Sequence, residues 1–136
     1  MNTKSTLLGS LSAFLWLYFM GWGFYNFLAV DFFVAHTVNM PQGVTMDLGM
    51  ITLGSFIQAI VVALMVHRAR DFKFFEGFKT GALVGLFIGA GVGTLQYGSA
   101  QLVDLTAVLV DAVWSVFYYG MAGGIVAWVF ARKQEA

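Results

Sequence analysis

The sequence has no cysteine, a single proline and few charged residues. The lack of cysteine excludes several kinds of site, and the shortage of charge excludes a water-soluble fold. Without cysteine the chain can form no disulfide, zinc–thiolate site or iron–sulfur cluster held by thiolates. Charged residues make up 10% of the 136 residues, against about 25% in an ordinary soluble domain. Hydrophobic residues make up 60%. A water-soluble chain this short could not bury so much apolar surface, so we predict an integral membrane protein.

The formal net charge is zero, so the composition does not favour nucleic acid as a partner. The expected partners are the lipid bilayer and either further copies of the chain or other membrane subunits. The only histidines, His36 and His67, are expected on opposite sides of the membrane and cannot share a metal within one subunit. No nucleophile–base pair, metal motif or phosphate-binding loop is visible. We therefore predict no catalytic residue and no metal site, and no motif implies a cofactor.

Apolar stretches long enough to cross a bilayer as helices, which takes about 20 residues, occur four times. They cover about residues 7–34, 48–66, 81–97 and 105–130, and the third is the shortest. Helices are expected because an open sheet would leave backbone groups unpaired in lipid. The sequence thus predicts an all-α fold, with residues 1–136 forming a single transmembrane domain built as a four-helix bundle.

The basic residues predict the orientation of this bundle. One precedes the first span, four lie between the second and third, and two follow the fourth: Lys4, Arg68, Arg70, Lys73, Lys79, Arg132 and Lys133. The segments Ala35–Asp47 and Gly98–Asp104 contain none. By the positive-inside rule, both termini are expected in the cytoplasm. We expect a multi-pass protein of a cell membrane, namely a bacterial inner membrane.

Phenylalanines alternate with charged residues in the segment between the second and third spans. They are Phe72, Phe74, Phe75 and Phe78. Aromatic rings favour the headgroup layer of a bilayer, and basic residues favour anionic lipid. We expect a short interfacial helix that anchors this segment. The alternative is a docking site for a cytoplasmic partner.

Glycines recur every fourth residue along the third span, at Gly77, Gly81, Gly85, Gly89 and Gly93. Such spacing clears one stripe of a helix, so a neighbouring backbone can approach closely. The fourth span offers small residues in return, among them Gly120 and Gly124. We expect this stripe to be a packing surface within the bundle. The alternatives are a seam between copies of the chain and a groove for a flat ligand or a lipid chain.

Asp111 is the main functional candidate, because an ionisable residue inside a span is costly and usually faces the bundle interior. At helical spacing it shares a face with Ser115 and Tyr118, whereas Trp114 lies on a face expected to meet lipid. Other spans supply polar groups at a similar depth, namely Asn26, Ser55 and Gln58. These residues predict either a polar chamber for a ligand or ion, or a hydrogen-bond network that only fixes packing.

Two further aspartates, Asp47 and Asp104, precede the second and fourth spans. Acids favour the positive end of a helix dipole, and aspartate is a good N-cap. We expect both residues to cap their helices rather than to bind a ligand.

The C-terminal half carries a resemblance. The stretch Gly81–Leu86, the run Leu109–Trp114 with its aspartate and the run Gly123–Val126 resemble small bacterial four-span membrane families of unknown function. The resemblance implies a polytopic inner-membrane fold but no activity, cofactor or reaction.

The sequence therefore leaves three functions open. The first is a transport, channel-like or small-ligand-binding membrane protein that acts as an oligomer. The second is a non-catalytic accessory or assembly subunit of a larger membrane complex. The third, an enzyme that acts on lipid or quinone, is the least favoured because no catalytic constellation is visible.

Overall fold

The computed structural model describes residues 3–43, 45–70 and 72–135. Its elements are α1 (Thr3–Gly23), the π-helix η1 (Phe24–Leu28), α2 (Val30–Ala35), α3 (Leu48–Ala69), α4 (Phe74–Leu86), the π-helix η2 (Phe87–Val92), α5 (Gly93–Ala100) and α6 (Leu105–Glu135). In the described part of the chain, four apolar stretches are long enough to cross a membrane: Thr3–Leu28, Leu48–Ala69, Phe74–Ala100 and Leu105–Gln134. The predicted all-α four-helix bundle is confirmed.

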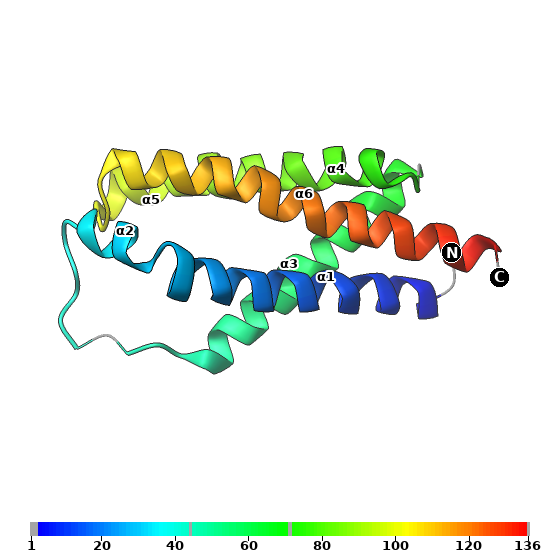
Figure 1. Ribbon diagram of the computed structural model, residues 1–136, viewed down its shortest axis with the longest axis horizontal. Helices are drawn as coiled ribbons and strands as arrows, with labels where there is room; N and C mark the ends of the chain where they lie inside the picture. Colours follow the sequence, from blue (N-terminus) through cyan, green and yellow to red (C-terminus); the bar gives the residue numbers. More distant parts are fainter. Residues whose placement is uncertain (1–2, 44, 71, 136) are drawn as a thin grey trace.

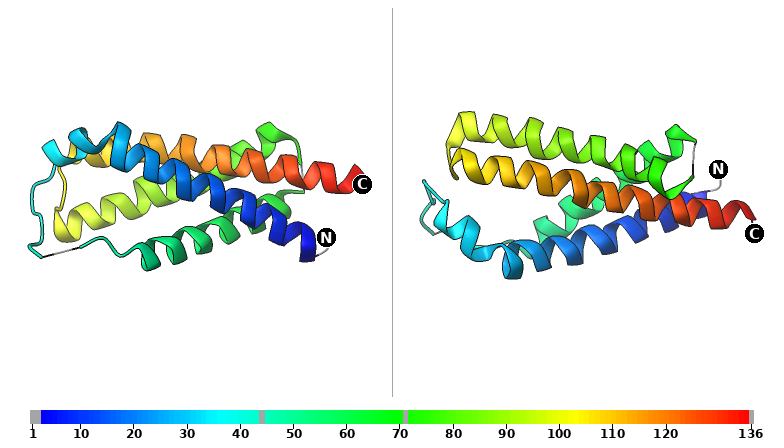
Figure 2. Two further views of the ribbon diagram at one scale, coloured as in Figure 1. Left: turned by 60° about the horizontal axis from the view of Figure 1, so that its bottom comes forward. Right: turned by 45° about the horizontal axis from the view of Figure 1, so that its top comes forward.

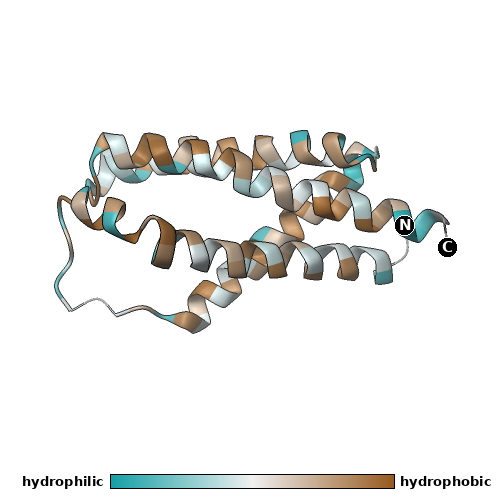
Figure 3. Cartoon of the chain, in the orientation of Figure 1, coloured by the Kyte–Doolittle hydropathy of each residue, from teal (hydrophilic) through white to brown (hydrophobic). Residues whose placement is uncertain are grey.

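The helices run along one long axis, and both chain ends lie at the same end of the bundle (Figure 1). The connection from α3 to α4 is also at this end, which we call the terminal end. The long α2–α3 loop and the short α5–α6 connection lie at the opposite end, as the turned views also show (Figure 2). There the backbone N–H of Asp104 donates to the carbonyl of His36 over 2.9 Å, which ties the two connections together. Most of the helical surface is apolar, with hydrophilic residues concentrated towards the ends (Figure 3).

The first apolar stretch is not one continuous helix up to Val34, as the sequence suggested. A break at Ala29, with φ −114° and ψ 7°, separates η1 from α2. The third stretch is longer than expected, since helix runs from Phe74 to Ala100 and exceeds α3 in length.

The interfacial helix expected before the third span is not a separate element, because Phe74 already begins α4. Two of the four predicted anchors are exposed, Phe75 at 74% and Phe74 at 37%. Phe72 packs against the buried core, and Phe74 and Phe78 cover Gly124 and Gly120 of α6. Three of the four rings thus contact the protein, and for Phe74 and Phe78 the glycines of α6 leave the room.

Helices α4 and α6 form the most closely packed pair of the bundle. A Cβ built on Gly81 or Gly85 would collide with the backbone of α6, at the carbonyl groups of Tyr119 and Ser115. Gly77 likewise faces Gly123, while Gly89 lies under Ser115, whose Cβ would be 2.6 Å away. Gly93 stands apart, since only Val108 comes within van der Waals range. Side chains are absent where the two backbones meet.

The buried core lies between α1, α3 and α6 towards the terminal end. Its fully buried side chains include Leu17, Val62, Val66, Val126 and Phe130. Two aspartates cap helices as expected: Oδ1 of Asp47 accepts from the N–H of Met50 over 3.1 Å, and Oδ1 of Asp104 accepts from the N–H of Ala107 over 2.9 Å.

Candidate functional site

A cavity of about 430 Å³ opens between α1, α3 and α6 on the side of the core that faces away from the termini. We call it the Asp111 cavity. All six residues that the sequence singled out as ligand or ion candidates line it: Asn26, Ser55, Gln58, Asp111, Ser115 and Tyr118. They come from η1, α3 and α6, so the fold brings together polar groups that are far apart in the sequence. Aromatic side chains complete the wall, namely Tyr18, Trp22, Tyr25 and Tyr119.

The carboxylate of Asp111 is held by Tyr25. The Tyr25 hydroxyl donates a hydrogen bond to Oδ1 of Asp111, across 86 residues of sequence. No partner for the second oxygen, Oδ2, is found among the described residues, and the lining residues include no lysine, arginine or histidine. The carboxylate therefore has a hydroxyl beside it but no countercharge within the cavity wall.

Two further tyrosines position the wall of the cavity. The Tyr119 hydroxyl donates to Oε1 of Gln58 over 2.8 Å, which joins α6 to α3. The Tyr118 hydroxyl donates to the carbonyl oxygen of Leu17 in α1. In addition, the indole N–H of Trp16 donates to the carbonyl oxygen of Tyr118 over 2.9 Å. These bonds fix the side-chain amide and the rings relative to one another.

Both π-helices of the described chain contribute to the site. Tyr25 and Asn26 belong to η1, and Ile88 of η2 also lines the cavity. A π-helical turn holds an extra residue and so rotates the side chains that follow it, and such turns are frequent at functional sites. Sequence reasoning at a period of 3.6 found Asn26 but missed Tyr25. The feature that could have identified Tyr25 is its hydroxyl group, which lies at the same depth in the span as Asn26.

Asp111 also lines a second, smaller cavity of about 200 Å³ towards the α5–α6 connection. Gln96 and Tyr97 of α5 and Phe33 of α2 form part of its wall. Asp111 thus lines two cavities, one inside the bundle and one near the end of the bundle.

Trp114 does not face lipid as the sequence suggested. Its ring stacks on Phe24 with a centroid separation of 3.9 Å and an interplanar angle of 10°, and its indole nitrogen is buried. The expectation was wrong because α1 crosses α6 here and covers that face. Phe117 and Trp128 of the same helix are half exposed, at 47% and 50%.

The histidines lie at opposite ends of the bundle, His36 after α2 and His67 in the last turn of α3. In the part of the chain that the structure describes, no three His, Asp or Glu side chains gather where they could hold a metal ion. A comparison of the chain with protein-family models, with curated proteins and with solved structures found no match.

Proposed function

We propose that this protein is a small-ligand-binding membrane protein, and that its ligand is a small organic cation held in the Asp111 cavity. The observation that carries the proposal is the convergence of polar residues from three apolar helices on one cavity around a single carboxylate. Polar groups inside spans are costly and usually mark a binding site or a pathway. Packing alone would not require a space of about 430 Å³ beside them.

The chemistry of the wall supports a cationic ligand. Asp111 supplies a negative charge, and no basic residue lines the cavity. Rings of Tyr18, Trp22 and Tyr25 surround the same space, and aromatic faces attract ammonium groups through their electron-rich centres. Gln58 and Ser55 supply further oxygen atoms that can accept hydrogen bonds from an amine. A cation would provide the countercharge that the wall lacks.

The packing between the two ends of the bundle favours binding over a continuous channel. A layer of fully buried apolar side chains, including Val62, Ala63 and Val126, lies between the Asp111 cavity and the terminal end. A solute could cross this layer only after the helices had moved. The proposal therefore assigns the cavity to ligand binding, with entry from the end opposite the termini.

Binding of matched cationic and neutral probes tests the proposal. Choline and its neutral isostere 3,3-dimethylbutan-1-ol would be titrated into the detergent-purified protein while the fluorescence of Trp22 and the other tryptophans is followed. We expect choline to bind at least about tenfold more tightly than the isostere, because the charge interacts with both carboxylate and rings.

The matched variants are Asp111→Asn and Asp31→Asn. Asp31 is an exposed aspartate in the first turn of α2 and does not line the cavity. Asp111→Asn should abolish the preference for choline, and Asp31→Asn should preserve it. Equal binding of the two probes to the wild-type protein, or an unchanged preference in Asp111→Asn, would refute a cation site at Asp111.

A further inference from the structure

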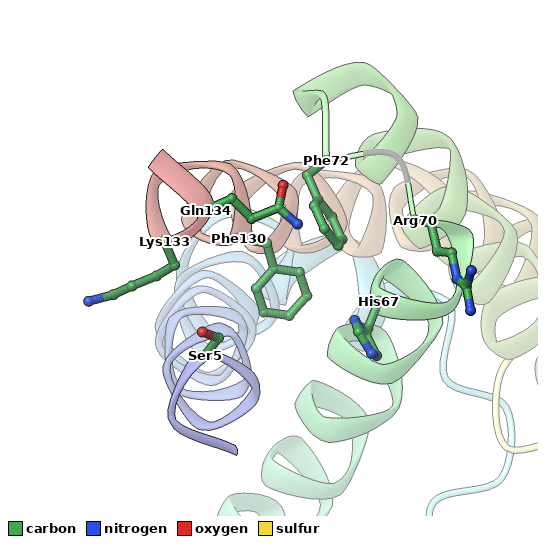
Figure 4. Close-up of a pocket in the computed structure, with 7 residues that line it drawn as sticks. All are labelled: Ser5, His67, Arg70, Phe72, Phe130, Lys133 and Gln134. Carbon is green, nitrogen blue, oxygen red and sulfur yellow. The ribbon is translucent and has the colours of Figure 1, made fainter. Parts of the chain in front are cut away.

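A third cavity, of about 490 Å³, lies at the terminal end of the bundle, on the other side of the buried core from Asp111. We call it the terminal cavity. It is formed where the start of α1, the end of α3 and the end of α6 meet, and Figure 4 shows its lining residues. Ser5, His67, Gln134, Arg70 and Lys133 are the polar residues of this lining.

The floor of the terminal cavity is aromatic and holds His67 in place. The ring of His67 stacks parallel to Phe72, with an interplanar angle of 6°, and meets Phe130 edge-on at 6.2 Å between centroids. Its Nδ1 is buried and has no hydrogen-bond partner among the residues that the structure describes. Buried polar atoms are nearly always paired in folded proteins. An imidazole without a partner beside a cavity is a feature that packing does not account for.

Two basic residues flank the terminal cavity on opposite sides, Arg70 at the end of α3 and Lys133 near the end of α6 (Figure 4). Their charged ends point outward in the figure, while the amide of Gln134 turns towards the space between the rings. Both side chains are exposed and have several rotatable bonds, so each charged end can turn over the opening without a change in the backbone.

By sequence, the segments at this end hold more basic than acidic residues. Among the side chains that the structure describes there, the only carboxylate is that of Glu76, and it is bonded to Lys79 over 2.6 Å. Arg68 and Arg132 add to the positive charge of the same end, although Arg132 lies over the ring of Trp128 at 4.3 Å. An anion at the mouth of the cavity would therefore meet a positive potential.

The backbone of Arg70 is itself unusual. It has φ 58° and ψ 5°, the left-handed region, at the C-cap of α3. Glycine is the common residue in this position because a Cβ is unfavourable there. An arginine is thus kept where glycine would suit the backbone better, which points to a use for its side chain.

We propose that the terminal cavity binds a phosphate-bearing anion, with the phosphate between Arg70 and Lys133 and hydrogen-bonded by Gln134, Ser5 or His67. The phosphate would belong to a phospholipid headgroup or to a soluble phosphate. Basic pockets between helices at the cytoplasmic surface suit anionic headgroups, and our predicted orientation places this end in the cytoplasm. The site is independent of the cation site at Asp111.

The test measures the shift in thermal unfolding of the detergent-purified full-length chain. One series adds short-chain dihexanoyl phosphatidylglycerol, with dihexanoyl phosphatidylcholine as the zwitterionic control. The other adds inorganic phosphate against chloride at equal ionic strength. Stabilisation by inorganic phosphate means that the phosphate group is sufficient, and stabilisation by phosphatidylglycerol alone identifies a lipid headgroup. No stabilisation by either probe overturns the proposal.

Variants separate this site from general surface charge. Arg70→Gln and Lys133→Gln should each weaken the effective probe about tenfold, the loss expected for a charge-assisted hydrogen bond. Arg68→Gln removes the same charge from an exposed neighbour that does not line the cavity, and it should weaken the probe much less than either of these variants. Equal losses of binding in all three variants would mean that the anion is attracted only by the net charge of this end and has no specific site.

Arg70→Gly protects the test against a folding artefact. Glycine fits the left-handed backbone at this position, so the protein without ligand should be at least as stable as the wild type. The same variant should lose the response to the anion about tenfold. If Arg70→Gly is stable and still binds the probe as the wild type does, Arg70 is excluded from the site.

Discussion

The hydroxyl of Tyr25 donates a hydrogen bond to the carboxylate of Asp111, and this bond joins η1 to α6 beside the cavity. The pair links the first and the last of the four apolar stretches. Among the described residues that line the cavity, Asp111 is the only charged one, and the bond orients its side chain. Its role in binding can be separated from its role in stability, because either partner can be replaced without a change in size.

Replacing Tyr25 by Phe should weaken choline binding with only a small loss of stability. The variant removes one hydrogen bond to Asp111 and keeps the ring. Interhelical hydrogen bonds in membranes contribute about 1 kcal/mol or less to stability, so the unfolding midpoint should change little. Choline affinity, measured by fluorescence titration, should fall several-fold because the carboxylate loses its orientation. An unchanged affinity would show that Tyr25 does not position Asp111 for binding.

Two glycines in different helices predict opposite results for the same substitution. Gly81→Ala should destabilise the protein by about 1–3 kcal/mol or more, since the added methyl group meets the backbone of α6. Gly54→Ala in α3 has no atom within 4 Å of the new methyl group, and it should be neutral or stabilising by up to about 1 kcal/mol. Denaturation in detergent followed by circular dichroism measures both. Equal stability of the two variants would contradict close packing at Gly81.

Capping by Asp104 can be tested in the same way. Its carboxylate accepts a hydrogen bond from the N–H of Ala107 in the first turn of α6. Asp104→Ala should cost about 1 kcal/mol of stability, whereas Asp104→Asn should retain most of it, because asparagine caps about as well as aspartate. If the two variants lose the same amount of stability, Asp104 stabilises the protein through its negative charge and not through its hydrogen bond to the start of the helix.

The orientation of the bundle stays a prediction that cysteine labelling can decide. The natural chain has no cysteine, so each introduced thiol is the only one. Gln42→Cys and Gln101→Cys lie in the connections at one end of the bundle, and Gln134→Cys lies at the other. In intact cells an impermeant thiol reagent should label the first two and spare the third. Labelling restricted to Gln134→Cys would reverse the orientation.

Much of the Asp111 cavity was predictable from the sequence. A polar residue inside a span is energetically costly, and the period of a helix shows which residues share its face. Asp111 and Ser115 share a face at a spacing of four, and hydropathy alone places Gln58 at a similar depth. The partners that α1 supplies were harder to predict. The π-helical turn η1 alters the rotation of the side chains around Tyr25, and a period of 3.6 does not describe it.

The errors have a different origin, which is contact between helices. Trp114 and Phe72 both have the character of residues that meet lipid or headgroups. In the fold, Trp114 stacks on Phe24, and Phe72 packs against Phe130 at 5.3 Å between ring centroids. Which apolar ring is covered depends on where another helix crosses, and a single sequence does not carry that information.

The glycine contacts between α4 and α6 also determine how the bundle can move. Where two backbones touch without side chains between them, neither helix can rotate or slide without overlap of their atoms. These helices therefore act as a rigid frame. Apart from Ile88 of η2 and Met46 of the α2–α3 loop, the other walls of the Asp111 cavity belong to α1 with η1 and to α3. Widening of that cavity must therefore come mainly from these helices, and the irregular turn at η1 is the natural place for α1 to bend.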